Sequence, residues 1–374
     1  MLIFISIVGL LFIHYLWLLS GMVRSFTNDQ KTEEEKSPVR NTFSIIIPFR
    51  NEAKVIRDTI ESLSRLDYDK ESFEIILVND HSEDDFQKQI GGLLDSSSII
   101  IIDNNGVGKK EAIETGVEKA KNEWILCSDA DCLFQEDWLI ACNNAINENS
   151  ADLFLFPVFI SEGKGLLGRF QYYDLLSTLG FNMGFYFYKG ISLLANGANI
   201  LYKKVDFQTI DPFKNNKRIS SGDDMFLLQE FKNNVKVIKM DCTSDLWVQT
   251  KGQVTWSAFF DQRIRWVKKM KFIKSDLSFY IGIYISAIQL ALWISLILGF
   301  FSLYIFYFFL ILIIVKTWAD FKLIKKISSY KNLHIEVGEI LFFEFIYMLI
   351  VPIILIVSVF RTPLWKGRKT LNRI

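Results

Sequence analysis

Long apolar runs stand near both ends of the chain, and a mixed pattern lies between them. Residues 1–22 contain no charged side chain, and neither do residues 277–315. A third run covers residues 340–360 and is interrupted by Glu344 and Pro352. A helix of about 20 apolar residues can cross a bilayer. The pattern therefore predicts an N-terminal membrane anchor and a C-terminal membrane region of about three apolar segments.

The charges around these runs predict an orientation in the bilayer. No Lys or Arg precedes the first run and no small-x-small cleavage site follows it, so we do not expect a cleaved signal peptide. Positive charges begin at Arg24, and the positive-inside rule then places the N-terminus outside and the central residues in the cytoplasm. We therefore expect a multi-pass protein of the cell inner membrane, with its central domain facing the cytoplasm.

The number of spans stays open because of two later positive clusters. Residues 316–338 hold five lysines, and the stretch from Arg361 to Arg373 holds five positive charges. Three C-terminal crossings would put these clusters on opposite sides, against the positive-inside rule. One segment that lies in the interface or re-enters the membrane would remove the conflict.

Between the apolar ends, short apolar runs alternate with amphipathic helical patterns, such as residues 52–66 and 109–121. This alternation is typical of the α/β class, a mostly parallel sheet with helices on both faces. A further amphipathic stretch, residues 166–179, is expected to rest on the membrane surface. The candidate strands are residues 43–48, 73–79, 98–102, 124–128 and 153–160. The predicted domains are an anchor at 1–23, a linker at 24–42, an α/β domain at 43–275, a membrane region at 276–361 and a basic tail at 362–374.

Polar clusters follow three of the candidate strands. They are Arg50-Asn51-Glu52, Asn79-Asp80 and Asp129-Ala130-Asp131. Ligands of open α/β sheets bind beyond the carboxyl ends of the strands, so the three clusters together predict one crevice. Asn and Asp also end strands and cap helices, and that interpretation suffices for any single cluster. Asp129 and Asp131 supply the oxygen ligands that Mg²⁺ and Mn²⁺ prefer, and such a pair commonly holds a metal–diphosphate.

Composition excludes several other classes of protein. Lys+Arg and Asp+Glu balance at 42 each, so we expect no nucleic-acid partner. The three histidines are far apart in the sequence and the four cysteines lack paired metal spacing, so zinc chemistry is not expected. Nothing in the composition predicts an oligomeric state.

The order of these motifs resembles that of the family 2 glycosyltransferases, whose nucleotide-sugar-binding fold is the GT-A fold. The stretch from Ile46 to Glu52 is similar to that family's first strand and turn, and Val78 to Ser82 is similar to its uridine-contacting segment. Asn79 stands there in place of the first of two common acidic residues. The turn with Lys109 is similar to the family's lysine-bearing turn ahead of the metal pair. The resemblance implies metal binding by Asp129 and Asp131 with Mg²⁺ or Mn²⁺, and donor binding by Pro48, Asn51, Glu52, Asp80, Lys109, Asp129, Gln262 and Arg265.

Three later segments extend the resemblance. Asp223-Asp224 is similar to the family's Glu-Asp segment, with Asp223 in place of the usual Glu, and the resemblance implies that Asp224 is the general base. A helix cap is the alternative role for this segment. Gln262, Arg265 and Trp266 match the Gln-x-x-Arg-Trp motif of membrane-bound members and would share one face of an interfacial helix. The implied acceptor-binding residues are Gly197, Asn199, Asp223 and Trp266, although a plain turn also accounts for Gly197 and Asn199.

The resemblance implies a membrane-bound inverting glycosyltransferase. We expect it to move a sugar from a nucleotide-diphospho-sugar, a UDP-sugar, to a lipid or lipid-linked acceptor. A processive polysaccharide synthase is an alternative, but about four apolar segments offer little material to enclose a channel. A catalytically idle membrane assembly subunit is a second alternative, which only the Asn79 and Asp223 departures support. A nucleotidyl transferase would leave the Gln-x-x-Arg-Trp motif unexplained. The donor sugar is not predicted.

Overall fold

The computed structural model describes residues 2–26, 39–93, 99–161, 163–217, 219, 221–270, 272–273 and 277–361, and the backbone of 364–365 and 368–369. The chain forms two compact units. The helical unit consists of Met1–Asp29, Glu162–Leu193 and Gln253–Arg361, and the sheet unit of Gln30–Ser161, Leu194–Gly252 and Thr362–Ile374. The predicted α/β domain at 43–275 thus contributes residues to both units. Most of the predicted linker and basic tail lies outside the described residues.

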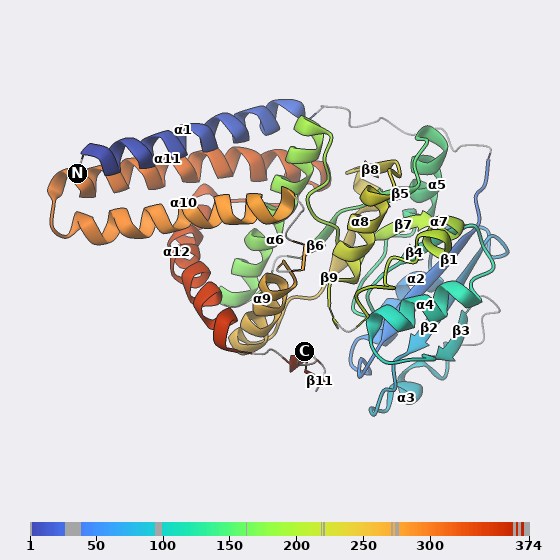
Figure 1. Cartoon of the computed structure of the whole chain (residues 1–374). Coiled ribbons are helices and arrows are strands. Elements are labelled where there is room, and N and C mark those ends of the chain that lie inside the picture. The colour runs from blue at the N-terminus through green and yellow to red at the C-terminus, as the bar shows by residue number, and fades with distance from the viewer. Residues whose placement is uncertain are drawn as a thin grey trace. The chain divides into compact units, whose positions relative to one another are not determined.

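The sheet unit is built on a seven-stranded sheet in the order β3-β2-β1-β4-β7-β5-β8, seen in Figure 1. Its first four strands in chain order run parallel, as do β5 and β8, while β7 is antiparallel to both of its neighbours. The strands are β1 Phe43–Phe49, β2 Phe73–Asn79, β3 Ile99–Asp103, β4 Trp124–Cys127, β5 Leu153–Leu155, β7 Ile200–Lys203 and β8 Ile238–Met240. A mostly parallel sheet is therefore confirmed.

Helices cover both faces of this sheet. α2 (Ile56–Ser64) and α5 (Trp138–Glu148) belong to the core cluster that contains Ile45 and Ile47 of β1. α4 (Lys109–Lys119) packs on the opposite face, where a Cβ atom added at Gly116 would lie 2.6 Å from Ile46 Cγ2. Glycine is therefore required for this close approach. The unit's remaining helices are α3 Phe86–Ile90, α7 Lys204–Ile210, α8 Asp223–Asn233 and the short 3₁₀ turn η1 Ser244–Leu246.

The strand register brings the predicted polar clusters to one edge. Phe49 of β1 is aligned with Asn79 of β2, which is aligned with Asp103 of β3, so these three strands end level. β4 runs parallel to β1 and ends at Cys127, opposite Ile46. The residues after β1, β2 and β4 therefore emerge at the same edge of the sheet, as expected for a ligand crevice.

The predicted strand at 153–160 is wrong in its continuity. Leu153–Leu155 joins the main sheet as β5, whereas β6 (Val158–Ile160) pairs with β9 (Val248–Thr250) in a separate two-stranded sheet. Pro157 lies between the two strands, and proline has no backbone N–H to donate to a ladder. The chain therefore changes sheets at this point.

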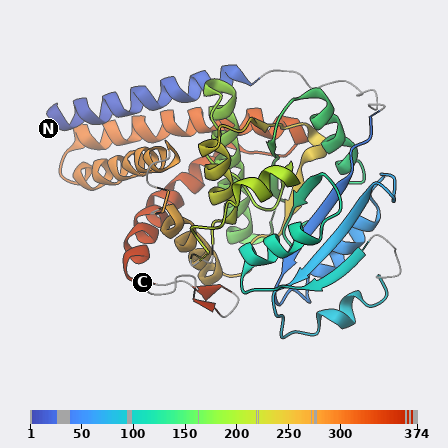
Figure 2. The same ribbon diagram turned by 45° about the vertical axis from the view of Figure 1, so that its right-hand side comes forward.

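The helical unit contains four helices that are long and apolar enough to cross a membrane, among the residues that the structure describes. They are α1 Leu2–Ser25, α10 Leu277–Gly299, α11 Leu303–Ser328 and α12 Val337–Phe360, with a 3₁₀ turn η2 Ser329–Lys331 after α11. α1, α10 and α11 lie side by side, as both views show (Figures 1 and 2). The two remaining helices are α6 Gly165–Lys189 and α9 Trp256–Met270.

α6 continues ten residues beyond the predicted stretch 166–179 and ends at Lys189. Its second half packs closely against the ends of α1 and α11. A Cβ atom added at Gly184 would lie 3.0 Å from Met22 Cβ of α1, and one at Gly180 would lie 3.1 Å from Ile327 Cγ2 of α11. Small residues four apart on one helix face allow this close contact.

Candidate active site

The turn after β1 is held by a buried arginine. Arg50 donates to the backbone oxygen of Asp80 at 3.0 Å and pairs with Glu83 at 2.7 Å. Asn51 has a φ of 53°, and its side-chain oxygen accepts from the Glu83 backbone N–H at 2.8 Å. Pro48 is buried within β1. These contacts fix the path of the chain into Glu52, which is only partly buried.

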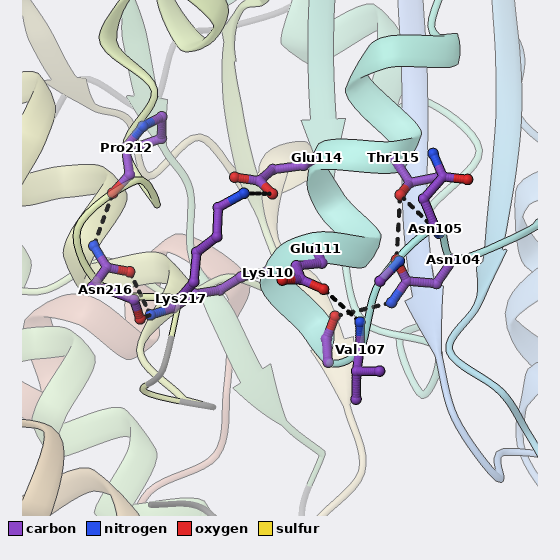
Figure 3. Close-up of polar contacts among 12 residues, drawn as sticks. Asn104, Asn105, Val107, Lys110, Glu111, Glu114, Thr115, Pro212, Asn216 and Lys217 are labelled. Atoms are coloured by element: carbon purple, nitrogen blue, oxygen red, sulfur yellow. Dashed lines mark hydrogen bonds and ion pairs between the residues drawn. The ribbon is translucent and has the colours of Figure 1, made fainter. Parts of the chain in front are cut away.

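Asp80 is buried at this edge of the sheet, with 1% of its surface exposed. Its Oδ1 accepts from the side chain of Asn104 at 2.9 Å and from the backbone N–H of Gly108 at 2.8 Å. Figure 3 shows Asn104 beside Thr115 of α4, to which it is hydrogen-bonded at 3.2 Å. Asp80 therefore holds the loop that leads into α4. Its predicted contact with the nucleoside stays a prediction.

The first two residues of α4 are neighbouring lysines with different partners. Lys110 is buried and donates to the side chain and backbone oxygens of Asn216, as drawn in Figure 3. Lys109 instead lies 2.7 Å from Asp129 Oδ1 and 3.0 Å from Asp223 Oδ2. Burial lowers the pKa of Lys109, but the two carboxylates outweigh that effect and raise this pKa well above its usual value. Lys109 is therefore a permanent cation that joins two predicted motifs.

Asp129 and Asp131 follow β4, and Asp131 has both Asp129 and Glu52 as acidic neighbours. Burial raises the pKa of Asp131 to about 7, and the charges of Asp129 and Glu52 add to this effect. A hydrogen bond with Thr250 opposes it. Repulsion of this kind is relieved when a cation binds, and oxygen ligands suit Mg²⁺ or Mn²⁺, which commonly take further ligands from phosphate and water. The carboxylate oxygens of the pair therefore suit a divalent cation that also binds a diphosphate.

No closed metal cage is present among the residues that the structure describes. No group of three or more His, Cys, Asp or Glu side chains there converges on a point where an ion would bind. The carboxylates of Asp129 and Asp131 would accordingly supply only part of the coordination sphere. This arrangement is typical of Mg²⁺ sites, which rely on one or two carboxylates plus substrate oxygens.

The raised pKa of Asp131 leads to a prediction for the metal-free protein. Its pKa of about 7 in the fold exceeds the ordinary value of 3.8, so the protonated form is favoured by folding. The contribution of protonated Asp131 to the free energy of unfolding is complete below about pH 4 and is lost as the pH rises through about 7. We expect Asp131→Asn to raise the thermal unfolding temperature at pH 8 by a few degrees, with EDTA present, and to change it little at pH 4.5. Equal shifts at both pH values would contradict this electrostatic account.

The start of α8 lies against a glycine loop. Asp224 Oδ1 accepts from the Met225 backbone N–H at 2.8 Å. A Cβ atom added at Gly197 would lie 2.8 Å from Asp223 Oδ2 and 3.1 Å from Lys109 Nζ. The same atom would lie 3.6 Å from Asp224 Cβ. Gly197 therefore lets the backbone approach a cluster of charged groups that a side chain would displace.

The predicted acceptor contact of Asn199 stays a prediction. None of its surface is exposed, and its side-chain nitrogen donates to the backbone oxygens of Pro157 at 2.9 Å and Leu246 at 2.7 Å. The amide is thus used to join β6, β7 and η1 in the core. A sequence pattern cannot separate this role from acceptor binding because an amide at a turn suits both.

The Gln-x-x-Arg-Trp motif lies on α9, in the helical unit, whereas the other candidate residues lie in the sheet unit. Within the motif, Arg263 makes the contacts that sequence reasoning missed. It pairs with buried Asp174 of α6, and its guanidinium carbon lies 4.0 Å from the centre of the Trp266 ring. Gln262 accepts from Arg263 at 3.3 Å. The signal in the sequence was that Arg263, a charged residue, occupies a variable position of this motif. Arg263 is therefore a positioning residue for α9.

The structure thus gathers Lys109, Asp129, Asp223 and Asp224 at one place in the sheet unit, beside Gly197. A mostly parallel sheet with paired carboxylates after a central strand is the arrangement of a nucleotide-sugar transferase fold. The sequence comparisons agree with this class. Residues 44–209 match the family model described as "Glycosyl transferase family 2".

Two similar proteins align with part of this chain. The poly-beta-1,6-N-acetyl-D-glucosamine synthase of Staphylococcus aureus is 26% identical over 132 residues, which cover 34% of this chain and 32% of that protein. The probable glycosyltransferase YdaM of Bacillus subtilis is 29% identical over 136 residues, with coverage of 34% and 32%. The chain thus matches about a third of the length of these relatives.

A solved structure shares the fold over nearly the whole chain. The mannosyltransferase PcManGT from Pyrobaculum calidifontis, in complex with GDP-Man and Mn²⁺, superposes with a TM-score of 0.57 at 13% identity. The alignment covers 93% of this chain and 97% of that one. Residues 44–209 are therefore similar to a family 2 glycosyltransferase domain, and the superposition shows that the chain shares its fold with this mannosyltransferase. The family match ends at residue 209, before the Asp223-Asp224 segment and α9.

Proposed function

We propose that this protein is a membrane-bound inverting glycosyltransferase that uses a nucleotide-diphospho-sugar, a UDP-sugar, and a lipid or lipid-linked acceptor. One observation carries the proposal. Lys109 Nζ lies 2.7 Å from Asp129 of the metal pair and 3.0 Å from Asp223, which precedes the base candidate Asp224. Donor and acceptor chemistry must meet at one point, and this lysine joins the two motifs that would perform it.

The donor's diphosphate would be held by charge. Asp129 and Asp131 would hold Mg²⁺ or Mn²⁺, which neutralises negative charge on a diphosphate leaving group when it is bound. Lys109 would exchange a carboxylate partner for a diphosphate oxygen, because its ammonium group is placed beside the pair. Glu52 and Asp80 would border the nucleoside end, with Asp80 holding the loop before Lys109.

Asp224 would act as the general base. A carboxylate in the first turn of α8 is oriented by its bond to the Met225 N–H, and a carboxylate can take a proton from an acceptor hydroxyl. Asp224 takes the hydroxyl proton while the acceptor oxygen forms a bond to the anomeric carbon. The bond between that carbon and the diphosphate oxygen breaks, and the electron pair leaves with the nucleoside diphosphate. One such displacement inverts the anomeric configuration.

A membrane-borne acceptor is supported by the helical unit. Four helices there are long and apolar enough to cross a bilayer, and α9 brings Gln262, Arg265 and Trp266 into the same unit. Arg265 would bind diphosphate oxygens through its planar fork, with Gln262 as a further donor, and Trp266 would offer a flat surface to a sugar or headgroup. The catalytic unit would face the cytoplasm at the inner membrane, by the charge pattern around α1.

A processive synthase is the second candidate, favoured by the name of the S. aureus relative. The two functions differ in product length. We would offer detergent-purified protein UDP-N-acetylglucosamine, UDP-glucose, UDP-galactose and GDP-mannose, each with Mn²⁺ and bacterial lipid extract. We expect one donor to give a lipid product that carries a single added sugar. A ladder of polymer sizes would favour the synthase, and folded protein that is silent with every donor would favour the idle subunit.

A further inference from the structure

The beginning of α12 is bound to α6. The Tyr173 hydroxyl donates to Glu339 at 2.7 Å and accepts from the Glu336 backbone N–H at 3.0 Å. Arg169 of α6 also pairs with Glu339. The neighbouring Tyr172 hydroxyl donates to the backbone oxygen of His334, in the loop before α12, at 2.6 Å. The first turn of α12 and the loop before it are therefore fixed on α6.

The end of α12 is bound to α9. Arg361, the residue after the helix, lies 2.9 Å from Asp261 of α9. α9 in turn is joined to α6 by the Arg263–Asp174 ion pair and by the rings of Phe259 and Phe170, whose centres are 5.6 Å apart. α6 and α9 thus form one layer, which we call the α6–α9 layer. Both ends of α12 are attached to it.

The α6–α9 layer must lie at the membrane surface. α9 carries five charged side chains, and ionised groups at the centre of a bilayer are strongly unfavourable. They are Asp261, Arg263, Arg265, Lys268 and Lys269. The 24 residues of α12 span about 36 Å, which exceeds a hydrocarbon core of about 30 Å. A crossing helix would have its ends at opposite surfaces, whereas these two ends meet one layer. In both views α12 runs at a steep angle to α1, α10 and α11 (Figures 1 and 2).

We infer that α12 is embedded in the bilayer leaflet next to the α6–α9 layer and does not cross the membrane. The chain then crosses three times, through α1, α10 and α11. Its partner is the acyl region of that leaflet, because the free sides of the helix are apolar along its whole length. The most exposed of these side chains are Phe342, Leu349, Ile356, Val359 and Phe360.

The charged group inside α12 is compatible with this depth. Glu344 accepts from Lys316 of α11 at 2.7 Å with both oxygens. Asp320 accepts from Lys316 at 2.5 Å and from the Tyr15 hydroxyl of α1 at 2.6 Å. All four side chains are buried, so the carboxylate of α12 meets protein and not lipid. The same contacts fix α12 against the bundle of α1 and α11.

Three crossings also satisfy the charge pattern. The five lysines of residues 316–338 and the five positive charges from Arg361 onward then fall on the same side of the membrane. The hairpin after α12, β10 (Leu364–Trp365) and β11 (Arg368–Lys369), belongs to the sheet unit. The residues of the sheet unit outside Thr362–Ile374 all precede α10. If α12 crossed the membrane, the hairpin would lie on the opposite side from them.

Cysteine accessibility in intact cells tests the inference. The four native cysteines are buried, so the wild-type background of maleimide labelling is expected to be low. Phe301→Cys reports the turn between α10 and α11, Ser329→Cys the end of α11, and Thr370→Cys the tail. With a maleimide that does not cross the membrane, we expect Thr370→Cys and Ser329→Cys to give the same labelling result. Phe301→Cys should give the opposite result. Labelling of Thr370→Cys together with Phe301→Cys would overturn the inference.

A second reporter removes any dependence on thiol reactivity. We would fuse green fluorescent protein or alkaline phosphatase to the C-terminus of the full chain. Fluorescence without phosphatase activity is expected, because green fluorescent protein folds in the cytoplasm and alkaline phosphatase needs the oxidising side. The reverse result would mean that α12 crosses. Neither outcome depends on the proposed transfer activity.

Discussion

Asp224→Asn is expected to lower the turnover number for sugar transfer by about 10³-fold while donor binding is unchanged. The substitution keeps the shape of the side chain and its bond to the Met225 N–H, but an amide does not accept the acceptor's proton. The lower turnover number therefore reflects a slower chemical step. Steady-state transfer and nucleotide titration on the same preparation measure the two quantities separately.

Two controls make this expectation specific. Asp137→Asn makes the same chemical change at an exposed position before α5, where the side chain forms no capping bond, and should leave transfer intact. Asp223→Asn alters the neighbouring carboxylate, which pairs with Lys109, and should weaken binding as well as turnover. An Asp224→Asn variant with full turnover would rule out this residue as the base.

Asp129→Asn is expected to lower kcat/KM at least about 10²-fold, because it would remove a proposed metal ligand and one of the carboxylates beside Lys109. A neutral amide is a weaker ligand for Mg²⁺ or Mn²⁺, so the remaining activity should require more metal. Titration of Mn²⁺ into the transfer assay would show the half-saturating concentration move upward. Wild-type activity that persists in EDTA would contradict the role of the pair.

A comparison with Lys109→Met separates the two contributions of Asp129. Lys109 is the cation that joins Asp129 and Asp223, and it is expected to bind a diphosphate oxygen when the donor enters. Lys109→Met should therefore raise the KM for the donor more than it changes the metal requirement. If both variants changed the metal requirement equally, Lys109 would act only by organising the carboxylates.

The candidate site follows well from the sequence where local pattern and topology agree. β1, β2 and β4 are short apolar runs that end in polar clusters, and parallel strands bring those ends to one edge. The order of the motifs therefore suffices to assign Asp129 and Lys109 to one crevice. The sequence does not reveal that Lys110, with the same side chain, turns away to Asn216. That difference depends on which side of α4 faces the sheet.

Other features depend on long-range packing and are not visible in a local pattern. Asn199 and Asp80 both occupy turns, where an exposed ligand contact and a buried structural bond have the same local signature. Asn199 is buried where it contacts η1, and Asp80 where it contacts the loop before α4. Both contacts join segments that are distant in sequence. The apolar run of α12 likewise has the length and composition of a membrane span. Its contacts with Tyr173 and Asp261 support our inference that it lies in one leaflet, and a local pattern does not contain such contacts.

The claim that Asp129 and Asp131 form a metal-assisted donor site is tested most directly by calorimetric titration of nucleoside diphosphates. UDP and GDP would be titrated into the full-length protein in detergent, with Mn²⁺ or with EDTA, and into Asp131→Asn under the same conditions. We expect one nucleotide to bind wild-type protein at least about tenfold more tightly with Mn²⁺, and Asp131→Asn to lose that gain. Equal affinities with Mn²⁺ and EDTA, or an unchanged gain in Asp131→Asn, would contradict the account.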